Sequence, residues 1–432
     1  MWDKKFETMS ADEMQVFQTA KLQETVAWVC QRIPYYKTKF AQMGIAPQDI
    51  DRLDYLAKLP FTVKSTLRDN YPVGLWAVPK QEVARIHASS GTTGKPMPVP
   101  YTEQDLAQWT QCMARTLSAA GVTSQDICQN AYDFGLFTGG AGFRQGAEKI
   151  GCCLIPAGFG MPARQVALMK DLGTTVLFST PSHALTIAEK AGELGVDLRS
   201  LPLRVGIFGA EPWTLKMRQE IEERMGIRAQ ETYGLTEMMG PGVSFDCQAQ
   251  DGYLHINEDH LLAEIIDPVT EEVLPLGAKG ELVLTAIQRR AMPLIRYRTR
   301  DLTELKREKC ACGRTLVKMK KVLGRSDDML IISGVNVFPC QIESLLLEVA
   351  EVEPQYMLII RKKGYLDALS VDVEAKPEAY ALGDQKHKEI EERIENLIRS
   401  AIGIGVKVRC MPPKSLERSE GKANRVLDAR QM

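Results

Sequence analysis

The stretch RVGIFGAEPWTLKMRQEIEERMGIRAQETYGLTE, residues 204–237, decides the class of fold. It opens with a short apolar run at residues 204–208, continues through a helical pattern and reaches a second apolar run at residues 229–233. Short apolar runs separated by a helical pattern are typical of βαβ units, in which the two strands are parallel. This stretch therefore predicts a mostly parallel sheet with helices packed on it.

The same alternation extends outward, from about residue 83 to residue 235. One intervening helix carries Leu106, Trp109, Met113 and Leu117 at helical spacing, which indicates a face turned to the core. The predicted strands, in chain order, are residues 83–87, 127–132, 152–155, 175–179, 204–208 and 229–233.

The pattern changes twice further along the chain. After Pro241 the segments are β-rich and bounded by Asp-Pro and Gly, which predicts a smaller β subdomain at about residues 241–323. After residues 324–328 the predicted order is helix (340–350), strand (356–361), strand (368–374), helix (385–402) and strand (406–410). The second of these helices has an apolar stripe, so this unit is expected to bury its own core and move as a body.

We therefore expect an α/β fold in two domains. The large N-terminal α/β domain, residues 1–323, includes the β-rich subdomain, and the small mobile α+β C-terminal domain covers residues 329–432. Residues 324–328 are the predicted hinge between them, with Asp327 at its centre. Such lengths are ordinary for one large and one small domain.

Composition excludes several classes of partner. The 432 residues contain 54 Lys and Arg against 55 Asp and Glu, so no net charge attracts nucleic acid or an anionic membrane. The N-terminus lacks an apolar leader, and no apolar run approaches the ~18 residues that span a bilayer. We expect a cytoplasmic protein with small-molecule partners, no nucleic acid and no membrane, and a homodimer is left open.

A loop rich in glycine and hydroxyl groups follows the first predicted strand. Glycines let the backbone approach a ligand closely, hydroxyls and backbone N–H groups donate to phosphoryl oxygens, and a lysine adds charge. The spacing differs from a Walker A loop, since two residues stand between the glycines and Pro96 follows the lysine. The predicted phosphate-binding residues are Ser89, Ser90, Gly91, Thr92, Thr93, Gly94 and Lys95.

Two further groups of candidate ligand-binding residues follow predicted strands, where open α/β sheets bind ligands, and a third is suggested by its chemistry alone. In YGLTE (233–237), a tyrosine ring can stack on a purine, Thr236 can meet a phosphate, and Glu237 can hold Mg²⁺. The small residues of Gly209-Ala210-Glu211 would let a ligand lie against the backbone. Asp301 could accept from ribose hydroxyls, with Arg325 in reach of ribose or phosphate.

The order and content of these motifs resemble the adenylate-forming superfamily, which includes acyl-CoA synthetases, firefly luciferase and adenylation domains of nonribosomal peptide synthesis. Within it the chain looks most like the phenylacetate-CoA ligase family. The motifs that carry the resemblance are SSGTTGKP (89–96), YGLTE (233–237), PLIRYRTRD (293–301), CACGR (310–314), GRSDDMLIISGVNVFP (324–339) and EGKANR (420–425).

This resemblance implies an ATP-dependent ligase that makes an acyl-AMP and transfers the acyl group to coenzyme A, while the small domain rotates about the hinge. It implies ATP, Mg²⁺ and coenzyme A as cofactors or substrates, with Lys422 as catalytic lysine, Glu237 on Mg²⁺, and Asp301 and Arg325 on ribose. The loop 89–95 would hold the triphosphate, and the implied contacts to adenine and the rest of the nucleotide are Gly209, Ala210, Glu211, Glu231, Thr232, Tyr233, Gly234 and Thr236.

An aromatic segment follows the second predicted strand. By resemblance it lies beside the acyl group, which would be phenylacetate or a similar aryl acid, and the candidate lining residues are Tyr132, Phe134, Gly135, Phe137 and Gly209. Simple core packing is an alternative role for Phe134 and Phe137. No basic residue lies in this segment to hold a second carboxylate, which favours a monoacid.

Three cysteines and a histidine have the chemistry of a structural zinc site. Cys310 and Cys312 are one residue apart, and Cys247 and His255 lie in the preceding β-rich region. A closed Cys₃His set binds tetrahedral Zn²⁺ and stabilises the fold, provided that both segments meet in space. The alternative is a set of reduced surface thiols and a solvated histidine.

Two other functions remain open. The chain could load an aryl or amino acid onto a carrier-protein thiol, although we find no room for a carrier domain. It could also be a silent nucleotide-binding scaffold, against which the presence of Glu237, Asp301 and Lys422 argues.

Overall fold

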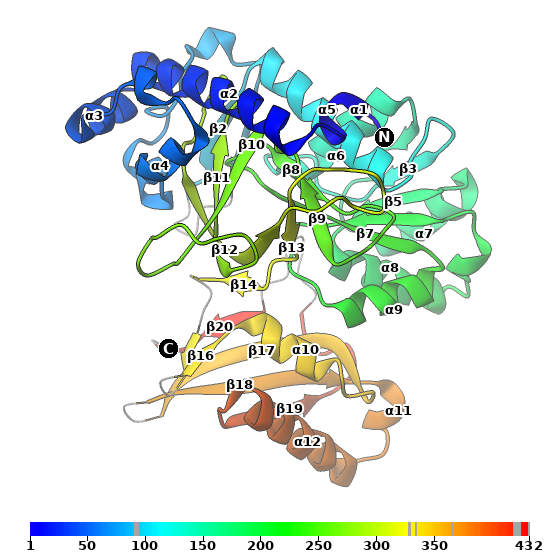
Figure 1. The fold of residues 1–432 in the computed structure, drawn as a ribbon. Helices are drawn as coiled ribbons and strands as arrows, with labels where there is room; N and C mark the ends of the chain where they lie inside the picture. The colour runs from blue at the N-terminus through cyan, green and yellow to red at the C-terminus, as the bar shows by residue number, and fades with distance from the viewer. Residues whose placement is uncertain (90–94, 327–329, 333–334, 364–365, 418–424, 431–432) are drawn as a thin grey trace.

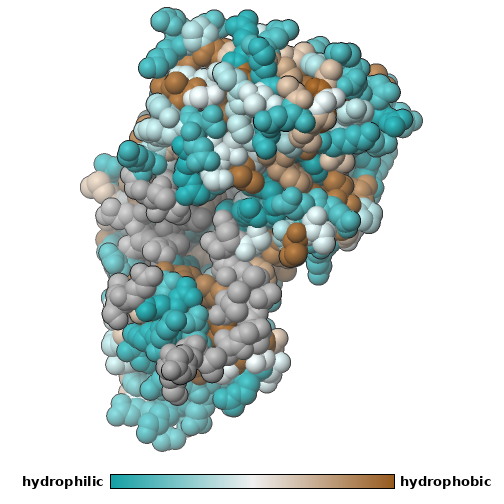
Figure 2. Space-filling view, turned by 90° about the vertical axis from the view of Figure 1, so that its left-hand side faces the viewer, coloured by the Kyte–Doolittle hydropathy of each residue, from teal (hydrophilic) through white to brown (hydrophobic). Residues whose placement is uncertain are grey.

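The computed structural model shows a large body and a small body (Figure 1). The structure describes residues 1–432 except 90–94, 327–329, 333–334, 364–365, 418–424 and 431–432. For six further residues it describes only the backbone: 331, 335, 336, 340, 363 and 366. Figure 2 shows the same two bodies in space-filling form, with hydrophilic side chains spread over the visible face of both.

One twelve-stranded sheet organises the large body. Its parallel half has the order β7-β6-β5-β3-β4, and these strands lie within a few residues of their predicted positions. The expected parallel sheet is therefore confirmed. Its strands are β3 (Ile127–Asn130), β4 (Cys153–Ile155), β5 (Val176–Ser179), β6 (Val205–Phe208) and β7 (Arg228–Leu235).

Helices fill the crossovers, as the spacing requires. The predicted stripe lies on α5 (Glu103–Ala119), where Trp109, Met113 and Leu117 are buried and Thr102 caps the first turn. α5 leads into β3, and the crossover helices between the parallel strands are α6 (Thr138–Ile150), α7 (Pro162–Leu172), α8 (Pro181–Glu193) and α9 (Leu215–Met225). The N-terminal region adds α1 (Lys4–Glu7), α2 (Ala11–Arg32), α3 (Pro34–Met43) and α4 (Lys64–Asp69), and 3₁₀ turns at Pro47–Asp49, Leu53–Lys58, Lys80–Glu82 and Leu198–Ser200.

The β-rich region after Pro241 continues the same sheet in antiparallel order. From β7 the sheet proceeds through β8, β9, β13, β12, β11 and β10, and β14 pairs with β12. The largest hydrophobic core of the large body includes buried residues of both halves, and two smaller clusters lie beside it. These strands are β8 (Gly240–Phe245), β9 (Tyr253–Ile256), β10 (Leu261–Ile266), β11 (Lys279–Ala286), β12 (Tyr297–Lys306), β13 (Lys318–Lys320) and β14 (Gly324–Arg325).

The prediction for residues 83–87 was wrong in partner and slightly in position. The strand is β1 (Arg85–Ser89), and it pairs antiparallel with β2 (Met97–Tyr101) outside the main sheet. Only residues 90–96 separate the two strands, and a parallel crossover needs a dozen residues or more. The phosphate-loop motif therefore joins the strands of a hairpin.

The small body has its own sheet, β19-β18-β17-β20, and its own hydrophobic core. Ile390, Ile394 and Ile398 of α12 are buried in that core and Leu397 packs at its edge, as the stripe predicted. Its elements are β15 (Leu330–Ile332), β16 (Val335–Val337), α10 (Pro339–Leu346), β17 (Val352–Lys363), β18 (Leu366–Ala375), α11 (Pro377–Tyr380), α12 (Asp384–Ile402), β19 (Val406–Met411) and β20 (Val426–Asp428). The hairpin β15–β16 and the edge strand β20 were not predicted.

Two general expectations can be compared with the structure. In the part of the chain that the structure describes, no helix combines the length and the apolar character needed to cross a bilayer. None of the nine cysteines with described side chains forms a disulfide, in keeping with the expected reduced thiols.

Candidate active site

The predicted nucleotide-binding motifs gather at the carboxyl ends of β6 and β7. These strands are parallel neighbours, with Phe208 paired to Glu231, so Gly209-Ala210-Glu211 and Tyr233-Gly234 leave the same edge of the sheet. This edge is where open α/β sheets bind ligands. The structure therefore brings together segments that are more than 20 residues apart in sequence.

A buried carboxylate is held at this edge by two donors. The Tyr233 hydroxyl donates to Oδ2 of Asp301 at 2.5 Å, and Arg325 donates to Oδ1 at 3.0 Å. Burial, followed by the charge of Asp301, raises the pKa of Tyr233 well above its usual value, so the phenol stays a donor. These bonds fix the orientation of the Asp301 carboxylate.

The backbone at the ends of β6 and β7 is closely packed at two glycines, where it allows no side chain. A side chain at Gly209 would collide with the Thr232 carbonyl, and one at Gly234 would collide with the Gly240 carbonyl. Ala210 adopts a φ of 72°, in the left-handed region that is strained for a residue with a Cβ. Such strain is characteristic of ligand-binding segments.

Glu237 is 8% exposed, and a buried cation holds its main chain. Arg289 donates to the carbonyl of Glu237 at 2.8 Å and to that of Pro100 at 3.0 Å, joining β2 to the YGLTE segment. Among the described residues, none donates a hydrogen bond to the Glu237 carboxylate, and carboxylate oxygens are ligands that Mg²⁺ prefers. The Thr236 hydroxyl lies 3.4 Å from that of Thr138, at the start of α6.

Two predicted nucleotide contacts have structural partners of their own. Glu231 forms an ion pair of 2.6 Å with Lys321, and the Thr232 hydroxyl donates to the Ser244 carbonyl at 3.0 Å. Both residues belong to β7, where their side chains are tied to the β-rich half of the sheet. Their predicted contact to nucleotide stays a prediction.

Several predicted residues lie outside the described residues: Ser90, Gly91, Thr92, Thr93, Gly94, Asp327 and Lys422. The two ends of the phosphate loop are described. Ser89 ends β1, half-buried, and Lys95 is exposed.

The aromatic segment after β3 divides between core and surface. Tyr132 is buried, stacks on Phe143 with ring centroids 4.9 Å apart, and donates its hydroxyl to the Ser179 carbonyl at 2.5 Å. Phe137 is 37% exposed, and Phe134 and Gly135 are also accessible. The segment lies against β1, because the Leu136 carbonyl accepts from the Ala88 N–H at 3.0 Å. It therefore stands beside the strand that leads into the phosphate-loop motif.

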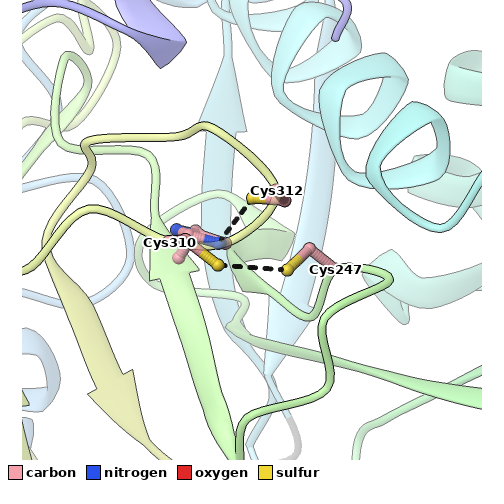
Figure 3. A group of neighbouring side chains, drawn as sticks. Cys247, Cys310 and Cys312 are labelled. Carbon is pink, nitrogen blue, oxygen red and sulfur yellow. Dashed lines mark hydrogen bonds between the residues drawn. The ribbon is translucent and has the colours of Figure 1, made fainter.

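The predicted metal ligands meet in space. Their ligand atoms all lie within 4.8 Å of one another, with Cys247 and Cys310 sulfurs 3.7 Å apart and the Cys312 sulfur 3.5 Å from Nε2 of His255. Figure 3 shows the three cysteine side chains pointing toward one another. Cys247 follows β8, His255 lies on β9, and Cys310 and Cys312 lie between β12 and β13.

The structure adds residues that the sequence did not single out. Arg425, the last residue of the EGKANR motif, donates to the Pro354 carbonyl at 2.8 Å and pairs with Glu343 at 3.4 Å. Leu347, just after α10, packs in a cluster of buried large-body residues that includes Phe208 at the end of β6. Burial lowers the pKa of Arg425, but the charges of Glu343, Tyr356 and Glu211 together raise it above its usual value. The order of residues in the motif gave no signal of these contacts of Arg425.

Comparisons with known proteins agree with this geometry. The family profile described as AMP-binding enzyme matches residues 43–288, and the profile described as AMP-binding enzyme C-terminal domain matches residues 334–430. The phenylacetate-coenzyme A ligase of Thermus thermophilus is 44% identical over 100% of both chains. That of Aromatoleum evansii is 46% identical over 98% of this chain and 96% of its own.

Solved structures of a more distant enzyme resemble the whole chain. The 2-hydroxyisobutyryl-CoA ligase in the postadenylation state, in complex with R3-HIB-AMP, is 26% identical and superposes with a TM-score of 0.93, covering 99% of this chain and 92% of that one. The same enzyme with 2-HIB-AMP and CoA in the thioesterification state is 27% identical, covers the same shares and gives 0.73.

Proposed function

Because the chain belongs to the AMP-binding enzyme family, we propose that it is a phenylacetate-CoA ligase. It joins phenylacetate to ATP, forming phenylacetyl-AMP and diphosphate, and then transfers the acyl group to the thiol of coenzyme A with release of AMP. The observation that carries this proposal is the full-length similarity, at 44–46% identity, to four ligases that bear this name.

The arrangement at the ends of β6 and β7 supports nucleotide binding there. Asp301, which Tyr233 and Arg325 orient, is the proposed acceptor for the ribose hydroxyls, and the Tyr233 ring is the proposed platform for adenine. Glu237 is the proposed ligand of Mg²⁺, which would neutralise phosphate charge during adenylation.

Catalysis of the first step is mainly positioning and electrostatic stabilisation. A carboxylate and a triphosphate repel each other, so cations and backbone donors must hold them in line while diphosphate leaves. Lys95, the hydroxyl-rich loop and Lys422 are the proposed sources of this stabilisation, and the step needs no covalent residue on the protein.

The acyl ring is proposed to lie near Phe134, Gly135 and Phe137. These residues are accessible next to β1, whereas the buried Tyr132 forms the wall behind them. An aromatic wall favours an aryl acid over acetate through burial of apolar surface.

We further propose that the cysteine and histidine cluster binds one structural Zn²⁺. With Zn–S of about 2.3 Å and Zn–N of about 2.0–2.1 Å, tetrahedral geometry places ligand sulfurs about 3.8 Å apart and sulfur and nitrogen about 3.5 Å apart. The separations of 3.7 and 3.5 Å fit those values. A metal here would tie β8 and β9 to the β12–β13 loop, which also binds the N-terminal segment through Arg314 and Glu7 at 2.6 Å.

The test is ATP–diphosphate exchange across phenylacetate, benzoate, acetate, a medium-chain fatty acid and phenylalanine, followed by thioester formation with coenzyme A. Phenylacetate should give the fastest exchange and a CoA-dependent product. Equal rates with acetate would contradict the aromatic pocket. Exchange without CoA thioester would favour loading of a carrier protein, and no exchange with any acid would favour a scaffold. Light scattering tests the homodimer.

A further inference from the structure

Charged residues meet where the small body lies against α8 and α9 (Figure 1). Lys414, between β19 and β20, forms ion pairs with Glu193 and, at 3.6 Å, with Glu189, both on α8. Arg224 of α9 lies 3.7 Å from Glu353 of β17. We propose that this charged seam holds the small domain in the orientation that carries out adenylation, with Lys414 as its main positioning residue. This proposal rests on the proposed function.

The turn that carries Lys414 is built to present it. Glu374 of β18, which is buried, accepts from the N–H of Lys414 at 3.1 Å and from that of Leu416 at 2.7 Å. The Ser415 hydroxyl donates to the Pro412 carbonyl at 2.7 Å, and Lys414 itself has a φ of 61°. Because the buried Glu374 carboxylate fixes Lys414 in a left-handed conformation, the backbone of this turn is preorganised. The turn therefore holds the lysine out from the small domain, where α8 meets it.

The acidic residues of α8 that pair with Lys414 belong to a longer contact between the large and small bodies. Residues of both bodies, among them Leu185, Glu189 and Arg224 on one side and Glu353, Pro413 and Lys414 on the other, line a cavity of about 40 Å³. That volume admits little more than one water molecule. The two bodies are thus in close contact along the seam.

Two observations connect this orientation to adenylation. The chain superposes on the postadenylation state of 2-hydroxyisobutyryl-CoA ligase with a TM-score of 0.93, and on its thioesterification state with 0.73. In addition, Leu347 of the small body packs among buried residues of the large body, and the charges of Glu343, Tyr356 and Glu211 raise the pKa of Arg425 against the effect of its burial. Arg425 is three residues after Lys422 in the sequence. The seam therefore accompanies an arrangement in which this end of the lysine motif lies within electrostatic range of Glu211, at the end of β6.

Weak pairs suit such a role. Lys414 and Glu193 are partly exposed, with 58% and 37% of their side-chain surface accessible, so solvent and salt screen their attraction. A two-step enzyme must leave this orientation for the second step, and a strong interaction would trap it. A modest bias between two orientations of similar free energy still changes their populations several-fold.

The experiment separates the two half-reactions in three variants: Lys414→Glu, Glu193→Lys and the two combined. In Lys414→Glu the new carboxylate faces Glu189 and Glu193, and acid-dependent ATP–diphosphate exchange should fall about five- to tenfold. Thioester formation from supplied phenylacetyl-AMP and coenzyme A should be unchanged or faster. The combined variant places the new carboxylate of the turn opposite the new ammonium group of α8, with Lys190 beside it, and should recover most of the lost exchange.

The matched control is Arg144→Glu, a charge reversal at an exposed pair with Glu148 on α6, away from the seam, which should leave both half-reactions unchanged. Energy transfer between two fluorophores, one on each domain, reports the orientation of the small domain independently of enzyme activity. The transfer efficiency should fall in Lys414→Glu and recover in the combined variant. Three outcomes would overturn the proposal. Lys414→Glu could slow both half-reactions equally, or it could leave ATP–diphosphate exchange unchanged. The combined variant could also fail to restore exchange although its melting temperature is native. If the wild type lacked acid-dependent exchange, the proposed function would fail, and the energy-transfer result would still decide whether the seam sets orientation. A milder Lys414→Ala variant decides the matter if charge reversal impairs folding.

Discussion

Asp301→Asn should weaken ATP binding without unfolding the site. Asp301 is 7% exposed and already accepts from Tyr233 at 2.5 Å and from Arg325 at 3.0 Å. The amide has the same shape and keeps one acceptor oxygen, so it can retain one of those bonds. What it loses is the charge that strengthens the proposed bonds from both ribose hydroxyls.

The expected magnitude follows from the difference between charged and neutral acceptors. A hydrogen bond to a charged group contributes ~1.5–3 kcal/mol and a neutral one ~0.5–1.5 kcal/mol, a loss of about 1 kcal/mol per ribose bond. Two bonds give ~2 kcal/mol, which is a roughly 30-fold rise in KM for ATP. kcat should change less, because the ribose contact is present in both the bound state and the transition state.

The assay is acid-dependent ATP–diphosphate exchange with ATP and with 2′-deoxy-ATP. Wild type should discriminate strongly between the two nucleotides, and Asp301→Asn should discriminate less, because the partner of the missing hydroxyl is already impaired. Asp197→Asn, at an exposed Asp–Arg pair with Arg199 outside the site, is the matched control and should behave as wild type. An unchanged KM, or a raised KM with undiminished discrimination between the nucleotides, would refute a direct ribose contact.

Three further predictions concern the lysine, the metal and pH. Lys422→Ala should slow acyl-AMP formation ~10²–10³-fold and spare thioester formation from supplied acyl-AMP, with Asp327→Pro giving the opposite pattern; equal slowing of both steps would contradict alternating domains. Cys310→Ser should lower zinc content by elemental analysis and lower the melting temperature before it lowers activity, whereas Cys153→Ser, exposed and outside the cluster, should do neither; a metal-free, fully stable wild type would sink the zinc proposal. Burial lowers the pKa of His183 from 6.5 to about 4, so the unfolded chain binds a proton that the folded chain does not between these pH values, and stability falls as pH drops through that window. The cost is about 2 kcal/mol at pH 5, and His183→Gln should flatten the melting-temperature profile between pH 7 and pH 5.

Local patterns predicted the elements of the parallel sheet well. The strands predicted at residues 204–208 and 229–233 are β6 and β7, with bounds that differ by a few residues. The apolar stripes of α5 and α12 face the hydrophobic cores of the large and small bodies. Each of these depends on side-chain periodicity within one segment, which the sequence displays directly. The strand at 83–87 was assigned to the wrong sheet, since periodicity within a strand carries no information about its partner.

The candidate site shows the same division. Residue types alone indicated a phosphate-binding loop, a carboxylate for the ribose hydroxyls and four ligands for a tetrahedral metal ion. Each of these functions requires particular donor or acceptor atoms, which the sequence lists directly. The sequence could not place Tyr132 behind the accessible aromatics, with its hydroxyl on the Ser179 carbonyl. It also gave no sign that Arg224 of α9 pairs with Glu353 of β17, because nothing in either segment encodes which face of the small domain turns to the large one.

By itself, then, the sequence determined the βαβ order, the separate core of the C-terminal unit and the chemical groups available at each strand end. The tertiary structure decided which of those groups meet. Cys247 lies 63 residues from Cys310, and Tyr233 lies 68 residues from Asp301, and each pair comes together only through sheet pairing. Lys414 meets α8 across 221 residues of sequence. Such contacts depend on strand register and domain packing, which are set by many weak interactions across the whole chain and leave no local pattern.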